Sequence, residues 1–141
     1  MKAIKLLAIV LGVYVGLVVA VESLVGIMGG RHVTRGVQPG ETWLLISTTA
    51  ADGVRKDAVV AGVESDGKLY VAANHWPRGW YNRAVENADV EITREGKKIA
   101  SRAVPVSGEE RVRIAEDYSL PWIVRLLTGF PPRSFLRLDP R

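Results

Sequence analysis

The sequence contains no cysteine and only two histidines among its 141 residues, which narrows the chemistry open to it. Without cysteine there is no disulfide framework, no thiolate metal site and no thiol catalysis. His32 and His75 are far apart in the sequence, so neither a metal site nor a hydrolytic triad is indicated. A glycine-rich phosphate loop and a nucleophile elbow are also missing, and the sequence identifies no catalytic residue.

The numbers of basic and acidic residues are nearly equal. The formal net charge is +4, from 19 basic and 15 acidic residues, which is too small an excess to indicate a nucleic-acid partner. The excess suits anionic lipid or a phosphorylated ligand. Hydrophobic residues at 48% and charged residues at 24% are ordinary for a folded protein and indicate neither disorder nor a multi-pass membrane protein.

One long apolar run stands at the N-terminus. Between residues 3 and 21 the only charged residue is Lys5, and the run is close to the length that a bilayer requires. We therefore expect residues 1–28 to form a single-pass transmembrane anchor. The alternative is a cleaved signal peptide, with small residues at 18–20 as the cleavage site, but Leu24, Val25, Ile27 and Met28 continue the apolar pattern past it. Basic residues on both sides leave the orientation open.

Beyond a polar connector at 29–42, residues 43–141 have the pattern of one mainly β domain. Asp52-Gly53, Asp66-Gly67 and Glu95-Gly96 separate apolar segments, and glycine at the second position supplies the positive φ of tight hairpin turns. About six strands joined in this way predict a small barrel. The expected strands are 43–49, 57–64, 68–73, 90–93, 98–106 and 135–138.

Short helices are expected between the strands. Apolar residues at helical spacing predict an amphipathic helix over 80–87. A second helix starts at Ser107, where Ser107 and Glu110 have the spacing of a capping box. A third lies between Pro121 and Gly129; its apolar residues favour burial in the core over contact with a membrane surface.

The segment from Asn74 to Tyr81 is the candidate binding site, because a strand ends there and a helix begins. Amide groups at that helix N-terminus, with His75 and Arg78, suit an anionic phosphate. Trp76, Trp80 and Tyr81 suit the flat apolar walls of a pocket for a planar ring. The alternative is a structural plug that closes one end of the barrel.

Three stretches resemble the deazaflavin-dependent nitroreductase family: residues 45–49 (LISTT), 66–73 (DGKLYVAA) and 80–92 (WYNRAVENADVEI). The resemblance covers the domain from Trp43 to Pro140 and implies a split β-barrel like that of flavin-binding, pyridoxamine-phosphate-oxidase-type proteins. It places the cofactor phosphate on Asn74, His75 and Arg78, with Trp80 beside them and Arg55 facing the cofactor from the second strand. The first turn is shorter than the family's, and residues 75–79 replace its glycine-rich loop.

These features together indicate a membrane-anchored oxidoreductase of the nitroreductase or quinone-reductase type. The resemblance implies hydride transfer from a reduced deazaflavin coenzyme (8-hydroxy-5-deazaflavin type), or from FMN, to a quinone-like or nitroaromatic acceptor, without a metal. The competing hypothesis is a membrane-tethered binding module whose barrel has lost its cofactor. The expected partners are the lipid bilayer and a small-molecule acceptor; a homodimer is compatible with either hypothesis, and nucleic acid is not expected.

Overall fold

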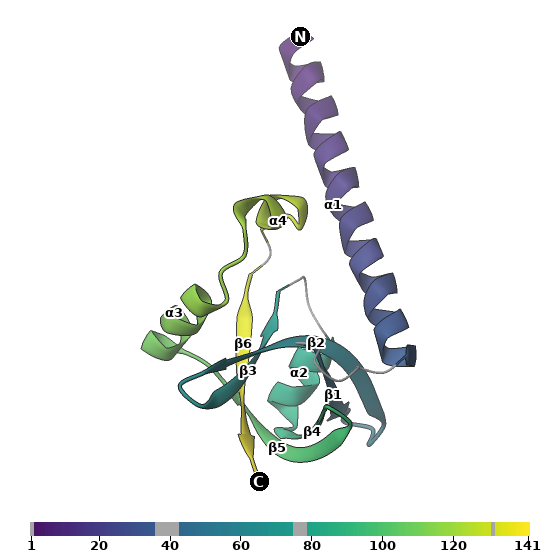
Figure 1. Ribbon diagram of the computed structural model, residues 1–141. Coiled ribbons are helices and arrows are strands. Elements are labelled where there is room, and N and C mark those ends of the chain that lie inside the picture. Colours follow the sequence, from purple (N-terminus) through teal and green to yellow (C-terminus); the bar gives the residue numbers. More distant parts are fainter. Residues whose placement is uncertain (1, 36–42, 75–78, 131) are drawn as a thin grey trace.

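The computed structural model describes residues 2–35, 43–74, 79–130 and 132–141. Its centre is a closed barrel of six antiparallel strands, in which neighbours follow the order β1-β2-β3-β6-β5-β4 (Figure 1). The barrel predicted from the sequence is therefore confirmed. The strands are β1 (Trp43–Thr49), β2 (Arg55–Ser65), β3 (Lys68–Ala73), β4 (Asp89–Arg94), β5 (Lys97–Pro105) and β6 (Ser134–Pro140).

Two hairpins have the turn chemistry that the sequence predicted. Asp66 and Gly67 between β2 and β3 have φ values of 50° and 70°, and Glu95 and Gly96 between β4 and β5 have 52° and 74°. Positive φ at both central residues matches the twist of the flanking strands, and glycine adopts it without steric cost. These turns fix the register on either side, for example Ser65 opposite Lys68.

The interior of the barrel is filled by alternate residues of every strand and by one helix. Trp80 and Ala84 of α2 (Gly79–Glu86) are buried in this core. The Arg83 side chain fastens the helix to β1, because its Nε donates to the buried Thr48 Oγ1 at 2.9 Å. The strand residues of the core are Leu44, Ile46, Val60, Val71, Ala73, Val90, Ile92, Ala103, Leu136 and Leu138.

A second, smaller core lies outside the barrel under α3 (Gly108–Asp117), where Ile114 packs with Tyr70 and Phe135. The capping box predicted at Ser107 does not form: Ser107 is the N-cap residue but makes no side-chain cap hydrogen bond. Glu110 instead accepts from Tyr70 Oη at 2.9 Å and pairs with Arg137. The capping prediction was wrong because the carboxylate has a better partner, a cation on β6.

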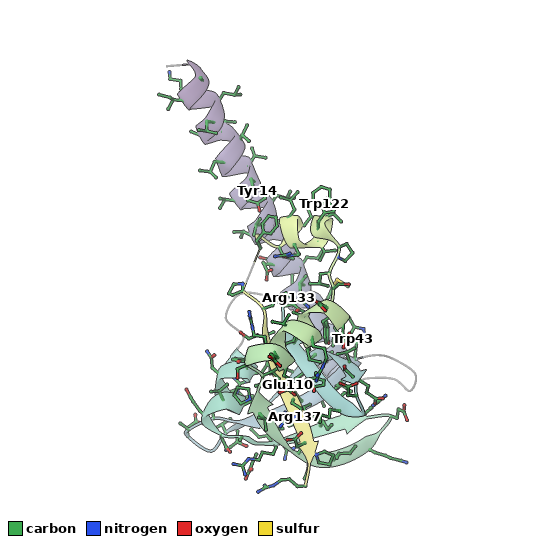
Figure 2. All side chains as sticks on the ribbon, turned by 90° about the vertical axis from the view of Figure 1, so that its left-hand side faces the viewer. Tyr14, Trp43, Glu110, Trp122, Arg133 and Arg137 are labelled. Carbon is green, nitrogen blue, oxygen red and sulfur yellow. The ribbon has the colours of Figure 1, made fainter. Side chains whose placement is uncertain are left out.

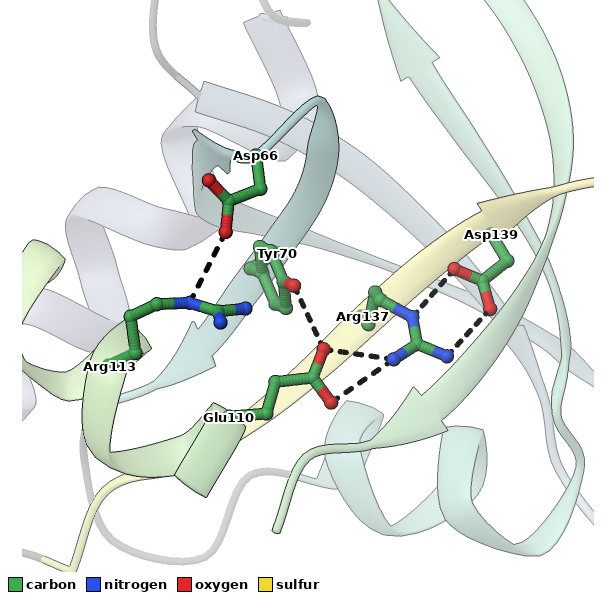
Figure 3. Close-up of polar contacts among 6 residues, drawn as sticks. All are labelled: Asp66, Tyr70, Glu110, Arg113, Arg137 and Asp139. Carbon is green, nitrogen blue, oxygen red and sulfur yellow. Dashed lines mark hydrogen bonds and ion pairs between the residues drawn. The ribbon is translucent and has the colours of Figure 1, made fainter. Parts of the chain in front are cut away.

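This polar network ties α3 to the barrel (Figure 3). Arg137 lies between two carboxylates: its Nη1 is 2.9 Å from Glu110 Oε1, and its Nε is 2.8 Å from Asp139 Oδ1. Hydrogen bonds from Arg137 lower the pKa of both carboxyl groups. The pKa of Tyr70 is raised, first by burial and then by its hydrogen bond to Glu110.

The N-terminal helix α1 (Lys2–Arg35) projects from the barrel, and the C-terminal end of α1 lies beside β2 (Figure 1). Its segment Ala3–Val25 is long and apolar enough to cross a membrane, and none of this segment is buried by the other residues that the structure describes. A signal sequence would have the same length and composition. The helix extends past Gly29 and Gly30, so the first half of the expected connector is helical. Glycine costs only about 1 kcal/mol in a helix interior, which a long preceding helix tolerates.

The short helix α4 (Trp122–Leu127) differs from expectation in its surroundings. It begins after Pro121 and ends near Gly129 as predicted, but it has no buried residue. Trp122 is 70% exposed and Phe130 is 52% exposed. The prediction that this segment packs into the core was therefore wrong, because the barrel interior is already filled and α4 lies beside α1 instead (Figure 1).

Candidate functional site

A pocket of about 340 Å³ lies on the outer face of the barrel. In β1, Leu45 and Ser47 alternate with the residues that fill the core, so their side chains point to this outer face. β2 and β4 add further residues at the same alternate spacing. The volume is at the lower end of the range for small-molecule sites. The lining residues are Leu45, Ser47, Arg55, Asp57, Glu91, Thr93 and Lys98.

The charges in this pocket are balanced. Arg55 Nη2 lies 2.5 Å from Glu91 Oε1, and Lys98 Nζ lies 3.2 Å from the same oxygen. Ser47 Oγ donates to Asp57 Oδ1 at 2.6 Å. Two cations therefore face two carboxylates, and an anionic ligand has to compete with Glu91 for Arg55.

The aromatic pair predicted as pocket walls belongs to the core. Trp80 is only 6% exposed, and Tyr81 is partly buried against the same cluster. Their rings meet edge to face, with centroids 5.9 Å apart. His75, Trp76 and Arg78, which complete the predicted site, lie outside the described residues.

Asn74, at the end of β3, has a partner that the sequence did not indicate. Arg133, just before β6, donates from Nε to Asn74 Oδ1 at 3.1 Å. The same guanidinium donates to the backbone oxygens of Ala115 and Tyr118 and lies over the rings of Tyr118 and Phe135. Local patterns could not have revealed this role, because Asn74 and Arg133 are 59 residues apart.

Arg133 belongs to a basic cluster with Arg111 and Arg125. Among the residues that the structure describes, none of the three has a carboxylate partner: Arg111 donates to Arg133 O, and Arg125 lies over the Phe130 ring at 5.6 Å. Burial and the neighbouring Arg125 and Arg111 charges lower the pKa of Arg133. This unneutralised positive charge favours an anion nearby.

The sequence offers Tyr81 and Tyr118 as possible proton donors and favours neither, and the surroundings of both are poorly suited to that role. Burial raises the pKa of Tyr118 to about 12, and its hydroxyl donates to the backbone oxygen of Ala61. Tyr81 packs against the core beside Trp80. Within the described ranges, no group of three or more histidine, aspartate or glutamate side chains is arranged to hold a metal ion.

The structure thus places four of the predicted site residues, in three different surroundings. Arg55 lines the outer pocket, Asn74 lies beside the basic cluster, and Trp80 and Tyr81 hold the start of α2. Among the described residues these are separate places on the barrel, and no contact joins them into one cluster. The pocket residues around Arg55 and the arginines around Asn74 are additions that the sequence alone did not supply.

The chain matches no known protein-family profile and no curated protein. Solved structures do share its fold. An F420-H2 dependent reductase is 22% identical, with a TM-score of 0.57, and the match covers 74% of this chain and 100% of that one. A structure described as a domain-swapped dimer is also 22% identical, with a TM-score of 0.58, covering 74% and 84% of the two chains.

A pyridoxamine 5'-phosphate oxidase-related, FMN-binding protein from Nostoc punctiforme has a TM-score of 0.54 at 15% identity, with 70% of each chain covered. The chain therefore has the split-barrel fold found in these deazaflavin- and flavin-related proteins, as its sequence resemblance implied.

Proposed function

We propose that this protein is a membrane-anchored oxidoreductase. It holds a reduced deazaflavin coenzyme of the 8-hydroxy-5-deazaflavin type, or FMN, against its barrel and passes a hydride to a quinone-like or nitroaromatic acceptor. The observation that supports this most is the closed barrel with a pocket at Arg55 on its outer face, in a fold that solved F420-dependent and FMN-binding proteins share. The coenzyme supplies the redox chemistry, and the protein binds and orients it.

In this proposal, different residues bind different parts of the coenzyme. Arg55 and Lys98 offer donors to an anionic or carbonyl edge in the pocket. Asn74, His75 and Arg78 form the phosphate grip, with Trp76 as a ring wall. Trp80 and Tyr81 act by anchoring the start of α2, since their rings are largely used in packing.

The described pocket residues can bind a cofactor of this class on one condition, which is that the ion pair between Arg55 and Glu91 opens. Glu91 neutralises Arg55 and Lys98, so an anionic group gains Arg55 only when the ion pair with Glu91 opens. Removing the Glu91 carboxylate should therefore strengthen binding of the coenzyme, and removing the Arg55 guanidinium should weaken it. An exposed ion pair contributes only about 0–1 kcal/mol, so this opening is cheap.

The test is a titration of the full-length protein in detergent with F420 and with FMN, followed by absorbance and thermal protection. We expect Glu91→Gln to bind more tightly than wild type and Arg55→Gln to bind more weakly by about 1.5–3 kcal/mol, the scale of a charge-assisted hydrogen bond. Arg102→Gln, an exposed arginine on β5, is the matched control. Equal affinity in all four proteins would remove the outer pocket from the site.

The charge balance of the pocket also supports a second candidate, a membrane-tethered binding module without a cofactor. This candidate predicts no spectral change and no thermal protection with either coenzyme.

The membrane anchor indicates which kind of hydride acceptor the protein uses. If Ala3–Val25 crosses a bilayer, apolar substrates dissolved in the lipid lie close to the barrel. We therefore favour a lipid-soluble quinone over a water-soluble acceptor. Liposomes that contain the full-length protein and the reduced coenzyme should oxidise it faster with a long-tailed quinone than with a short-tailed analogue. Equal rates would contradict access from the bilayer.

A further inference from the structure

The helix α4 presents an apolar surface that the other described residues leave uncovered. Trp122 is 70% exposed, Ile123 45% and Phe130 52%, and no residue of α4 is buried. Three large apolar side chains within nine consecutive residues, two on α4 and one three residues beyond its end, are more than the scattered exposure of an ordinary surface. Exposure of such a surface to water is unfavourable, which favours a partner that covers it.

The position of α4 indicates what covers it. Tyr14 of α1 donates from its hydroxyl to the backbone oxygen of Leu126 at 3.0 Å, so the two helices are held side by side. Tyr14 lies midway along Ala3–Val25, and about 16 Å of helix separates it from either end at 1.5 Å per residue. Figure 2 shows Tyr14 and Trp122 at the same height, away from the barrel. A bilayer that holds the apolar segment of α1 therefore also holds α4.

We propose that α4 is a second membrane-inserting element, which enters the lipid beside α1 and seats the end of the barrel on the bilayer. The exposed side chains of Trp122, Ile123 and Phe130 are then covered by acyl chains.

Carbonyl groups near the C-terminal end of α4 have hydrogen-bond partners within the protein, as burial in lipid requires. A helix end leaves its last carbonyl groups without partners, which is costly in lipid. Here Val124 O accepts from Thr128 N and Thr128 Oγ1, and Arg125 O accepts from Phe130 N at 2.8 Å. Leu126 O accepts both Gly129 N and the Tyr14 hydroxyl. A water-exposed helix end would not need a buried threonine and a tyrosine from another helix for this purpose.

The basic cluster of Arg111, Arg125 and Arg133 supplies the matching charge. In Figure 2, Arg133 lies between the level of Trp122 and the network of Glu110 and Arg137 on the barrel. Arg133, and Arg111 bonded to its backbone oxygen, lie on the barrel side of α4 and face the anionic phosphates of lipid headgroups. Arg125 is in the last turn of α4 and extends its long side chain toward the same headgroups. The order of apolar surface, cations and folded barrel along one direction is that of a bilayer interface.

The absence of cysteine allows a direct test of depth. The full chain carrying Ile123→Cys is labelled with a nitroxide and placed in vesicles of phosphatidylcholine with phosphatidylglycerol. Accessibility to oxygen, which concentrates in lipid, is compared with accessibility to a water-soluble nickel complex. Val10→Cys on α1 is the membrane reference, and Val112→Cys on α3, also an exposed valine, is the aqueous reference.

We expect the label at 123 to resemble the label at 10, with oxygen accessibility favoured several-fold over the label at 112. A label at 123 that is as accessible to the nickel complex as the label at 112 would overturn the proposal. Spin–spin broadening at 123 would also overturn it, because a second copy of the chain would then cover α4.

The headgroup contact has its own test. Omitting phosphatidylglycerol should reduce the depth of the label at 123, and the pair Arg111→Gln and Arg125→Gln should have the same effect. Both residues are preferred over Arg133, which several backbone contacts hold in place. The control is Arg102→Gln, because Arg102 lies opposite Asp139 in the register of β5 and β6, near the end of β6 that points away from α4. Equal depth in all lipids and variants would refute a role of the basic cluster in lipid contact.

Discussion

Replacing Glu110 with glutamine tests whether α3 is held to the barrel by its charge. The side chains of Glu110 and Arg137 are 26% and 21% exposed, so their ion pair is more shielded than a surface pair. The substitution removes the charge that assists both the Tyr70 hydrogen bond and the pair with Arg137. Hydrogen bonds to charged groups contribute about 1.5–3 kcal/mol, which we expect as the loss in free energy of unfolding.

In thermal unfolding of the full-length protein in detergent, followed by near-UV circular dichroism, this loss corresponds to a fall in Tm of about 6–15 °C for a domain of this size. Glu109→Gln is the matched control, because Glu109 is exposed in the same first turn of α3 and has the same favourable interaction with the helix dipole. That control should cost no more than about 1 kcal/mol.

The pH dependence supplies an independent check. Because the folded-state pKa of Glu110 is lowered, its contribution is complete above the unfolded pKa near about 4.3 and is lost as the pH falls through the folded value. The difference in stability between wild type and Glu110→Gln should therefore shrink below about pH 4. Equal losses of Tm in the Glu109 and Glu110 variants, or a difference that does not change with pH, would refute the reasoning.

Three further predictions concern the barrel and its surroundings. Gly62→Ala should lose about 1–3 kcal/mol of stability, because its Cβ would lie 2.6 Å from Leu44 Cδ1 in a packed core, whereas Gly12→Ala, with no atom within 4 Å, should lose nothing measurable. Trp80→Ala should lose about 3–5 kcal/mol in urea unfolding, because a buried ring leaves a cavity; a smaller loss would place the ring outside the core. Tyr118 has a pKa of about 12 in the folded state against about 10 unfolded, so stability should fall between these pH values. Tyr118→Phe should show a shallower fall, measured by unfolding at alkaline pH, and an unchanged slope would contradict the burial of the phenol.

Much of the fold could be predicted from local sequence, because strands and tight turns leave local signals. Alternation in β3 and β4 and the glycines after Asp66 and Glu95 were sufficient to place the hairpins. Features that depend on distant partners could not be predicted in this way. The spacing of Ser107 and Glu110 was that of a capping box, but the carboxylate is held by Arg137 from a strand 27 residues further on.

The candidate site was predictable only in part for the same reason. Arg55 could be placed on the second strand, but not its ion pair with Glu91, which requires β1 to bring β2 and β4 together. The exposure of α4 was missed because an apolar helix has the same composition whether protein or lipid covers it.

The position of β6 in the barrel has a consequence for synthesis of the protein. β6 is the last of the six strands to leave the ribosome, yet it pairs with both β3 and β5. Until it arrives, those two strands keep unpaired edges, which are templates for pairing with other chains. The apolar helix α1, by contrast, is made before any of these strands. During translation the protein is thus a nascent chain with its hydrophobic segment made and its barrel still open, and it depends on chaperones or rapid completion to avoid aggregation.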